Sequence, residues 1–347
     1  MTDKPDYSHV AQSILDLPTI LSQPAPPIHW AVPGIIAEED ITFISGIGGI
    51  GKSYVMLSLA ISLASGKPLF SHFPITRQYN VAYIDMEMAE METRRRVARM
   101  LKGMEFTPQN VPPNLHVGVR GTLLLDSLDS TKQLAAFIKH HKLDFICIDP
   151  YRRVYMGDDK GSDTSNRVFK ILSALRNEHR VGFMFVAHWR KRSQEDALND
   201  PKERLMGTAD QRNMIDCHIS VQPGGEEDTL KIEPDKGRHG DSAQEDFRVA
   251  FQHDDAFDPD GPFRLVYLAP TSGKREQTIL AELTKQDGQW ISYTQLATSS
   301  TLHPKAIQRG AARLIAAQLV ERKKVGKEWC LKATGQQAND SASQLDN

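Results

Sequence analysis

An apolar run that ends in a glycine-rich loop constrains this chain more than any other feature. Residues 41–53 read ITFISGIGGIGKS, a short β-branched strand followed by the complete pattern GxxxxGKS. Glycines let the backbone turn so that its N–H groups point inward, where they bind phosphate oxygens. Residues 54–64 are mostly apolar or small and predict a buried helix, whose N-terminal dipole strengthens the anion site. Strand, loop and helix in this order indicate a bound nucleoside triphosphate rather than a chance glycine-rich turn.

The pattern also assigns roles to its residues, and the expected cofactors are ATP and Mg²⁺. Lys52 is expected to bind the β- and γ-phosphates, and the Ser53 hydroxyl to bind Mg²⁺. The residues expected to contact the nucleotide are Gly46, Ile47, Gly48, Gly49, Ile50, Gly51, Lys52, Ser53 and Tyr54.

Length and composition favour a soluble protein with one large domain and one smaller domain. The chain has 347 residues, more than an average domain. No run of about 20 apolar residues occurs and the N-terminus is polar, so we expect no membrane span, no membrane partner and a cytoplasmic location. Cys147, Cys217 and Cys330 lie far apart, which predicts buried thiols rather than disulfides or a zinc site.

Strands and helices alternate along residues 31–268, after an N-terminal leader at residues 1–30 with a short helix at 8–17. This alternation predicts an α/β fold with a mainly parallel sheet covered on both faces. Strands are expected at 41–46, 79–87, 115–119, 145–149 and 182–188, and helices near 90–102, 130–141 and 163–178. Two later segments, 218–221 and 230–233, are expected to be antiparallel strands.

The pattern changes near Lys274. Segments at 275–285, 292–299 and 304–319 predict three helices, and 321–331 predicts a β-hairpin that turns at Gly326. Three helices and a basic hairpin are typical of a winged helix-turn-helix domain, which we expect at residues 274–333, before a disordered polar tail at 334–347.

This C-terminal region is basic, unlike the rest of the chain. Residues 274–332 contain 11 Lys and Arg against 5 Asp and Glu, a net charge of +6, whereas the whole chain has a net charge of −2. The residues expected to meet DNA are Lys305, Gln308, Arg309 and Arg313 on the third helix, and Lys323 and Lys324 on the hairpin. A solvated basic face or a protein-docking module is the alternative.

Two acidic positions complete the expected ATPase site. Asp149 ends an apolar strand about 100 residues after the loop, where a carboxylate is needed to hold Mg²⁺. Hydrolysis also needs a group that orients water beside the γ-phosphate, and Glu87 follows another strand at the edge of the sheet where such sites form. Asp85, two residues earlier, is the rival because it faces the same side.

In the order of these motifs the chain resembles the RecA/DnaB-type hexameric ATPases, and among them the RepA-like plasmid replicative helicases. The resemblance spans about residues 28–250. The matching segments are Trp30–Gly34, Gly46–Ser53, Tyr83–Glu87, Ile148–Arg153, Phe185–His188, Gly207–Ala209 with Asp216, and Lys236–Gly240.

The resemblance implies further roles. It makes Glu87 the catalytic glutamate and His188 the polar sensor of the γ-phosphate. From its residue type alone, His188 could equally be a buried or capping histidine. It makes Lys236 and Arg238 a KxR element that reaches the neighbouring subunit's nucleotide, which implies a homo-oligomer and a hexamer. A solvated Lys-Gly-Arg turn is the alternative.

Two loops after the predicted strands would face the centre of such a ring, at residues 157–162 and 189–204. The second carries Trp189, Arg190, Lys191 and Arg192, an aromatic and basic set suited to single-stranded DNA. An ordinary surface loop is the alternative. The sequence therefore predicts a ring-forming helicase, and its rival is a DNA-binding regulator or loader in which ATP controls assembly without unwinding. A metabolic P-loop kinase is disfavoured because no lid or acceptor-substrate signature is present.

Overall fold

The computed structural model describes two folded units and part of the leader. The described residues are 16–24, 27–119, 123–125, 127–155, 162–189, 214–237, 246–253, 258, 260–269, 274–286, 288–300, 302, 304–316, 319–326 and 328–334. The short helix expected at 8–17 lies almost entirely outside them, and the described helix of the leader is α2 (Leu17–Ser22), capped by Asp16. The tail, from residue 335, also lies outside them.

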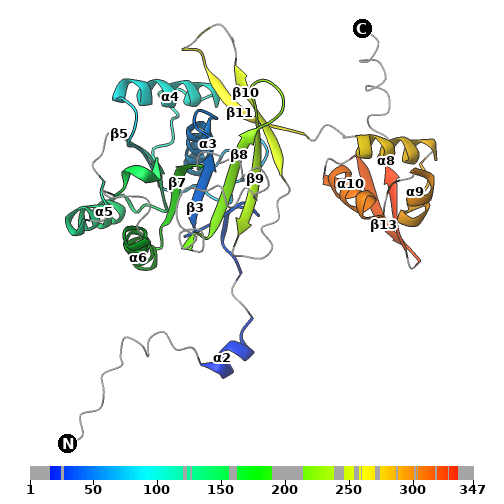
Figure 1. Ribbon diagram of the computed structural model, residues 1–347, viewed down its shortest axis with the longest axis horizontal. Helices are drawn as coiled ribbons and strands as arrows, with labels where there is room; N and C mark the ends of the chain where they lie inside the picture. The colour runs from blue at the N-terminus through cyan, green and yellow to red at the C-terminus, as the bar shows by residue number, and fades with distance from the viewer. Residues whose placement is uncertain are drawn as a thin grey trace, which may run out of the picture.

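The described part of the large unit contains a nine-stranded sheet in the order β11-β10-β9-β8-β3-β7-β6-β4-β5 (Figure 1). Its strands are β3 (Ile41–Gly46), β4 (Val81–Asp85), β5 (Leu115–Val119), β6 (Phe145–Asp149), β7 (Gly182–His188), β8 (Cys217–Pro223), β9 (Thr229–Gly237), β10 (Phe247–His253) and β11 (Phe263–Leu268). A separate antiparallel pair, β1 (Trp30–Val32) and β2 (Ile36–Ala37), precedes them.

The direction of one strand differs from the sequence-based expectation. The segment expected to be antiparallel at 218–221 is β8, which pairs with β3 in parallel, Gly46 lying opposite Val221. The segment at 230–233 belongs to β9, which is antiparallel to β8 as predicted. Strand direction depends on the path of the connecting chain, and the sequence of a short apolar run does not indicate that direction.

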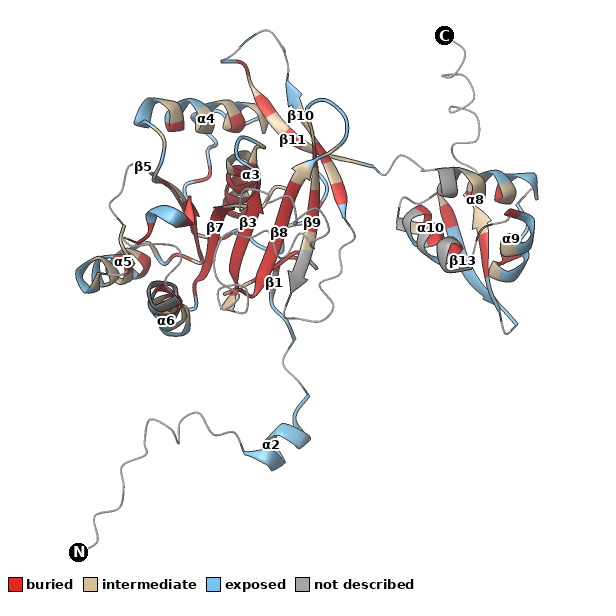
Figure 2. Ribbon diagram, in the orientation of Figure 1, coloured by how far each residue is buried: buried red, intermediate tan, exposed pale blue. Residues whose placement is uncertain are grey.

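Helices cover both faces of the sheet, as the alternation predicted. On one face α3 (Lys52–Ser65) and α4 (Glu90–Gly103) contribute to one apolar core. On the other face α5 (Leu128–His141) and α6 (Ser162–His179) contribute to a second core. Figure 2 shows that the central strands between these cores are buried, and β3 is buried along its whole length. A strand between two apolar layers needs apolar side chains on both faces, which explains its continuous apolar run.

The strand order brings together the strand ends that carry the predicted site residues. The loop strand β3 lies between β8 and β7, and β6, which carries Asp149, is one strand beyond β7. Since β8, β3, β7, β6 and β4 are parallel, their carboxyl ends meet at one edge of the sheet. This topology confirms the predicted α/β class and is a RecA-like P-loop core.

The C-terminal unit has its own apolar core, formed by Ile279, Leu283, Ile291, Leu296, Ile307, Ala311, Leu314, Val320 and Leu331. Its elements are α8 (Lys274–Lys285), β12 (Ile291–Ser292), α9 (Tyr293–Ser300), α10 (Pro304–Ala316), β13 (Val320–Val325) and β14 (Glu328–Ala333). The predicted hairpin forms with Val325 opposite Glu328, and Gly326 adopts a positive φ of 63° in the turn. Strand β12, which was not predicted, adds to β14.

Two simpler expectations can also be compared with the structure. All three cysteines are buried and free, as predicted. Among the helices of the described residues, none has the length and apolar character that crossing a bilayer requires.

Candidate active site

The glycine-rich loop joins β3 to α3 and holds Lys52 at the first position of the helix. Gly51 caps α3 in the left-handed region with φ 105°, and Gly49 has φ 75°, a conformation that side-chain-bearing residues rarely adopt. A Cβ at Gly48 or Gly49 would meet no atom within 4 Å, so the loop is not packed against other described residues at these two positions. The loop therefore fits a phosphate chain approached by backbone N–H groups.

Lys52 lies in this cradle and is almost fully buried, with 4% of its surface exposed. Its Nζ donates a hydrogen bond to the Ile47 carbonyl oxygen at 2.6 Å. Burial lowers the pKa of Lys52 to about 8, and the charges of Asp149 and Glu87 oppose that shift. A cation with one protein hydrogen bond and two facing carboxylates is well placed to bind a phosphate.

Asp149 ends β6 and faces Ser53, the residue after Lys52. The carboxyl group is buried, accepts a hydrogen bond from the Ser53 hydroxyl, and has a pKa raised to about 6, chiefly because burial disfavours its charged form. A hydroxyl and a carboxylate are oxygen ligands of the kind that Mg²⁺ prefers, with phosphate oxygens and water as the remaining ligands. The described residues contain no group of three or more acids, histidines or cysteines that holds a metal without such help.

Asp85 and Glu87, the two candidates for orienting water, have different surroundings. Asp85 is buried, and its Oδ1 accepts hydrogen bonds from the backbone N–H groups of Glu87 at 3.1 Å and Met88 at 3.0 Å. Its Oδ2 accepts a hydrogen bond from the Thr93 hydroxyl at 2.9 Å. Glu87 is exposed and lines the cavity at the P-loop. Asp85 therefore holds the turn that carries Glu87, whose carboxylate faces the cavity.

One cavity of about 290 Å³ brings the predicted residues together. It is lined by Gly49, Gly51, Lys52, Ser53, Tyr54, Glu87, Met88, Arg96, Asp149, Val186 and His188. His188 ends β7 directly opposite Gly46 of β3, so the strand order delivers it to the loop. Burial and the charge of Lys52 lower the pKa of His188, which favours the neutral imidazole. A neutral imidazole both donates and accepts hydrogen bonds, as a sensor of phosphate requires.

A second cavity of about 380 Å³ adjoins this one, because Glu87 and His188 line both. Pro150, Arg152 and Arg153 complete its lining. The two arginines are exposed and directly follow the Asp149 strand in a short 3₁₀-helix, η1 (Tyr151–Arg153). Both belong to the segment Ile148–Arg153 of the family resemblance, which implied no role for them.

Arg96 is a residue of the site that sequence reasoning missed. It lies on α4 and lines the nucleotide cavity, where it forms an ion pair with Glu92 at 3.2 Å. Its guanidinium lies 5.4 Å from the ring centre of Tyr54. Tyr54 in turn packs edge-on against Phe251 and Phe263, which belong to the antiparallel strands β10 and β11. In the sequence, Arg96 is one of several charged residues on the helix that follows Glu87, and the pattern of that helix is typical of a solvent-exposed surface.

Trp189, expected in a DNA-contacting loop, is bonded to the sheet. Its indole N–H donates to the Ser45 hydroxyl at 2.9 Å, and its backbone N–H donates to the Gly46 carbonyl oxygen at 3.1 Å. Ser45 is also hydrogen-bonded to His218 at 2.6 Å. Trp189 thus anchors the start of its loop beside the P-loop strand. Arg190, Lys191 and Arg192, together with residues 157–161 of the first loop, lie outside the described residues.

None of the remaining predicted residues that the structure describes lines the cavity. Lys236 belongs to β9, where it pairs with His218, and Arg238 lies outside the described residues. Lys305, Arg309 and Arg313 lie on α10, and Lys323 and Lys324 are exposed on β13. Asp216, part of the family resemblance, is buried and accepts hydrogen bonds from the Ile41 backbone N–H and from Arg176, which ties β3 to α6.

Comparison with known proteins identifies the core independently. Residues 11–194 match the AAA_25 family, described as an AAA domain, and this match covers just over half of the chain. It includes the glycine-rich loop, Glu87, Asp149 and His188, and it ends before β8. No curated protein matches the chain. The strand order, the P-loop with its buried lysine and the match over residues 11–194 agree, and the chain therefore belongs to the AAA_25 family of AAA domains.

Proposed function

We propose that this protein is a ring-forming, DNA-dependent ATPase, a RepA-like replicative helicase of a plasmid or mobile element that couples ATP hydrolysis to movement on single-stranded DNA. The ring is a hexamer of identical subunits. The proposal rests on the residues gathered around the P-loop, on the place of the KxR element in the sheet, and on the basic C-terminal unit.

In this mechanism the chain's own residues bind and orient the nucleotide. Lys52 and the loop N–H groups hold the phosphates, and Ser53 and Asp149 would hold Mg²⁺, which neutralises phosphate charge when bound. Glu87 accepts a hydrogen bond from the attacking water and orients it. His188, which lines both cavities with Glu87, reports the state of the γ-phosphate to the loop that begins at Trp189.

The position of Lys236 in the sheet is the observation that best supports the proposed ring of subunits. Lys236 lies opposite His218, which lies opposite Phe43 of β3, three residues before the loop begins at Gly46. At the rise of a β-strand, three residues span about 10 Å, so Lys236 lies about 10 Å from the level of Gly46 along the sheet. This displacement is toward the edge of the sheet that lies away from the nucleotide cavity. The backbone of Lys236 therefore lies toward the opposite edge of the sheet from its own P-loop, which supports the proposal that the KxR element acts at a neighbour's site, where Arg238 would stabilise charge on the transferring phosphoryl group.

The C-terminal unit supplies the proposed contact with DNA. Its three helices and three-stranded sheet support a winged helix domain, with α10 as the recognition helix and the β13–β14 hairpin as the wing. Arg322, Lys323 and Lys324 are consecutive and exposed on β13, where they would neutralise phosphates.

A second candidate function rests on the same basic C-terminal unit. A basic domain of this kind also suits a regulator or loader that binds duplex DNA while ATP controls assembly, without unwinding.

Strand displacement on a forked duplex separates the two functions. With ATP and Mg²⁺, the wild-type protein is expected to release the labelled strand, whereas Glu87→Gln binds the fork and releases none. Binding of an intact duplex with ATP-dependent assembly and no strand release would favour the regulator and contradict the helicase.

A further inference from the structure

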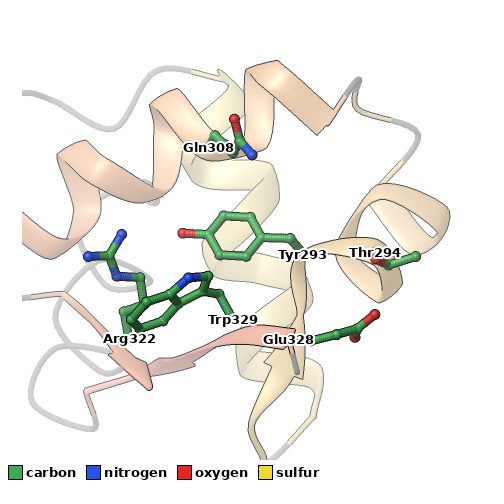
Figure 3. Close-up of a pocket in the computed structure, with 6 residues that line it drawn as sticks. All are labelled: Tyr293, Thr294, Gln308, Arg322, Glu328 and Trp329. Carbon is green, nitrogen blue, oxygen red and sulfur yellow. The ribbon is translucent and has the colours of Figure 1, made fainter. Parts of the chain in front are cut away.

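The C-terminal unit contains a cleft whose lining includes two residues already expected to meet DNA, Gln308 and Arg322. It has a volume of about 440 Å³, within the range of small-ligand sites, and lies between the start of α9, the middle of α10 and the hairpin. The residues that line it are Tyr293, Thr294, Gln308, Arg322, Glu328 and Trp329 (Figure 3). Two aromatic rings, one cation, one carboxylate and three groups that both donate and accept hydrogen bonds thus line one space.

Trp329 gives the cleft an aromatic surface. Trp329 is 47% exposed, which is unusual for so large an apolar side chain in a small unit whose core is formed by other residues. Figure 3 shows the Tyr293 ring between the Trp329 indole and Gln308. The Arg322 guanidinium lies 4.7 Å from the Trp329 ring centre. The guanidinium lies over one face of the indole, in a cation–π contact, and leaves the other face for a stacked ring.

The register of the hairpin places positive charge around this surface. Lys324 lies directly opposite Trp329, and Arg322 is two residues earlier on the same strand, so Arg322, Lys324 and Trp329 share one face. Lys323 points to the other face and lies 5.9 Å from the ring centre of Trp290. Cations beside an aromatic surface suit a ligand that carries both phosphate and a flat ring.

We infer that this cleft binds an unpaired nucleobase of a DNA strand, stacked on Trp329. This inference rests on the proposed DNA binding and adds a preference for single-stranded DNA at the C-terminal unit. Bases in a duplex are stacked on one another and do not offer a free face to an indole, so the cleft discriminates between an unpaired base and a paired one.

Photochemical crosslinking with the full-length protein tests this directly. The probe is a single-stranded oligodeoxythymidylate that carries one 5-iododeoxyuridine, and the comparison probe is the same strand in a blunt duplex. Digestion with trypsin releases residues 328–332, EWCLK, as a short peptide that contains Trp329. We expect the single strand to label this peptide and the duplex to leave it unlabelled.

Matched variants complete the test. Trp329→Ala is expected to abolish the label and to weaken single-strand binding by the unit about tenfold, while Trp329→Phe retains part of both because it keeps an aromatic face. Val325→Ala, an equally exposed apolar residue at the tip of the hairpin, is the control and is expected to behave as wild type.

The outcomes separate this inference from the proposed function. Equal labelling of residues 328–332 by the single strand and the duplex would overturn the preference for unpaired bases. Labels found only in peptides of residues 31–268 would overturn the cleft as a base site and leave DNA binding by the core intact. Absence of binding to both probes would overturn the proposed function itself.

Discussion

At the scale of single residues, the surroundings of two carboxylates decide which one is available for chemistry. Asp85 is buried and accepts three hydrogen bonds, so its charge stabilises the turn after β4. Glu87 is exposed and lines the cavities on both sides of His188. A carboxylate whose oxygens already accept hydrogen bonds from the protein is poorly suited to bind water, whereas Glu87 is free to do so.

Replacing each carboxylate is therefore expected to affect different properties. Glu87→Gln should reduce the turnover of ATP by about 100-fold or more, with the free energy of unfolding unchanged to within about 0.5 kcal/mol. Asp85→Ala should lower the free energy of unfolding by about 2–4 kcal/mol, because buried hydrogen bonds to a charged group are lost. Steady-state hydrolysis and urea unfolding measure the two effects. If Glu87→Gln destabilises the fold and Asp85→Ala does not, the assignment is reversed.

At the scale of secondary structure elements, the close contact between β3 and β8 explains one glycine of the loop. A Cβ at Gly46 would lie 2.4 Å from the Val221 carbonyl oxygen, far closer than any contact the backbone tolerates. The neighbouring Gly48 has no atom within 4 Å of the corresponding position and does not have a positive φ. Gly46 thus permits the close pairing of β3 with β8, whereas no packing contact among the described residues requires a glycine at Gly48.

This difference can be measured by a matched pair of substitutions. Gly46→Ala is expected to lower the free energy of unfolding by about 1–3 kcal/mol, because β8 must shift away from β3. Gly48→Ala should change that free energy by less than about 0.5 kcal/mol while weakening nucleotide binding. Urea unfolding without nucleotide and titration with a fluorescent ATP analogue provide the two readouts. Equal stability of both variants would show that β8 adapts to the extra methyl group.

At the scale of the whole molecule, the proposed ring predicts that two inactive variants restore activity to each other. Lys52→Ala damages a subunit's own site, whereas Arg238→Ala damages the neighbour's site. In an equal mixture about a quarter of the interfaces pair an intact P-loop with an intact Arg238, so ATP hydrolysis should return in part. A mixture of Lys52→Ala with Glu87→Gln is the control, because both residues act within one subunit.

The result of this mixing experiment also decides the role of the KxR element. Activity in the first mixture and none in the control is the outcome expected for a shared site. Full activity of Arg238→Ala alone would remove the arginine from the mechanism, and no activity in either mixture would contradict a site shared between subunits.

The sequence by itself determined the parts of this protein that depend on local pattern. The GxxxxGKS loop, the alternation of strands and helices and the apolar run ending at Asp149 each describe a few consecutive residues, and the structure contains them at the predicted positions. Before the family resemblance was considered, the sequence favoured Glu87 over Asp85 only modestly, because residues two apart in a strand face the same side. Their hydrogen bonds now distinguish them.

Only the tertiary structure decided features that join distant segments. The parallel direction of β8, the place of Arg96 beside Tyr54, the anchoring of Trp189 and the cleft around Trp329 each depend on residues far apart in the chain. Hydrophobic periodicity records which face of a segment is buried, but it does not record which segment covers it. Long-range packing therefore determined how the candidate site is enclosed, and local sequence determined the residues that were predicted to form it.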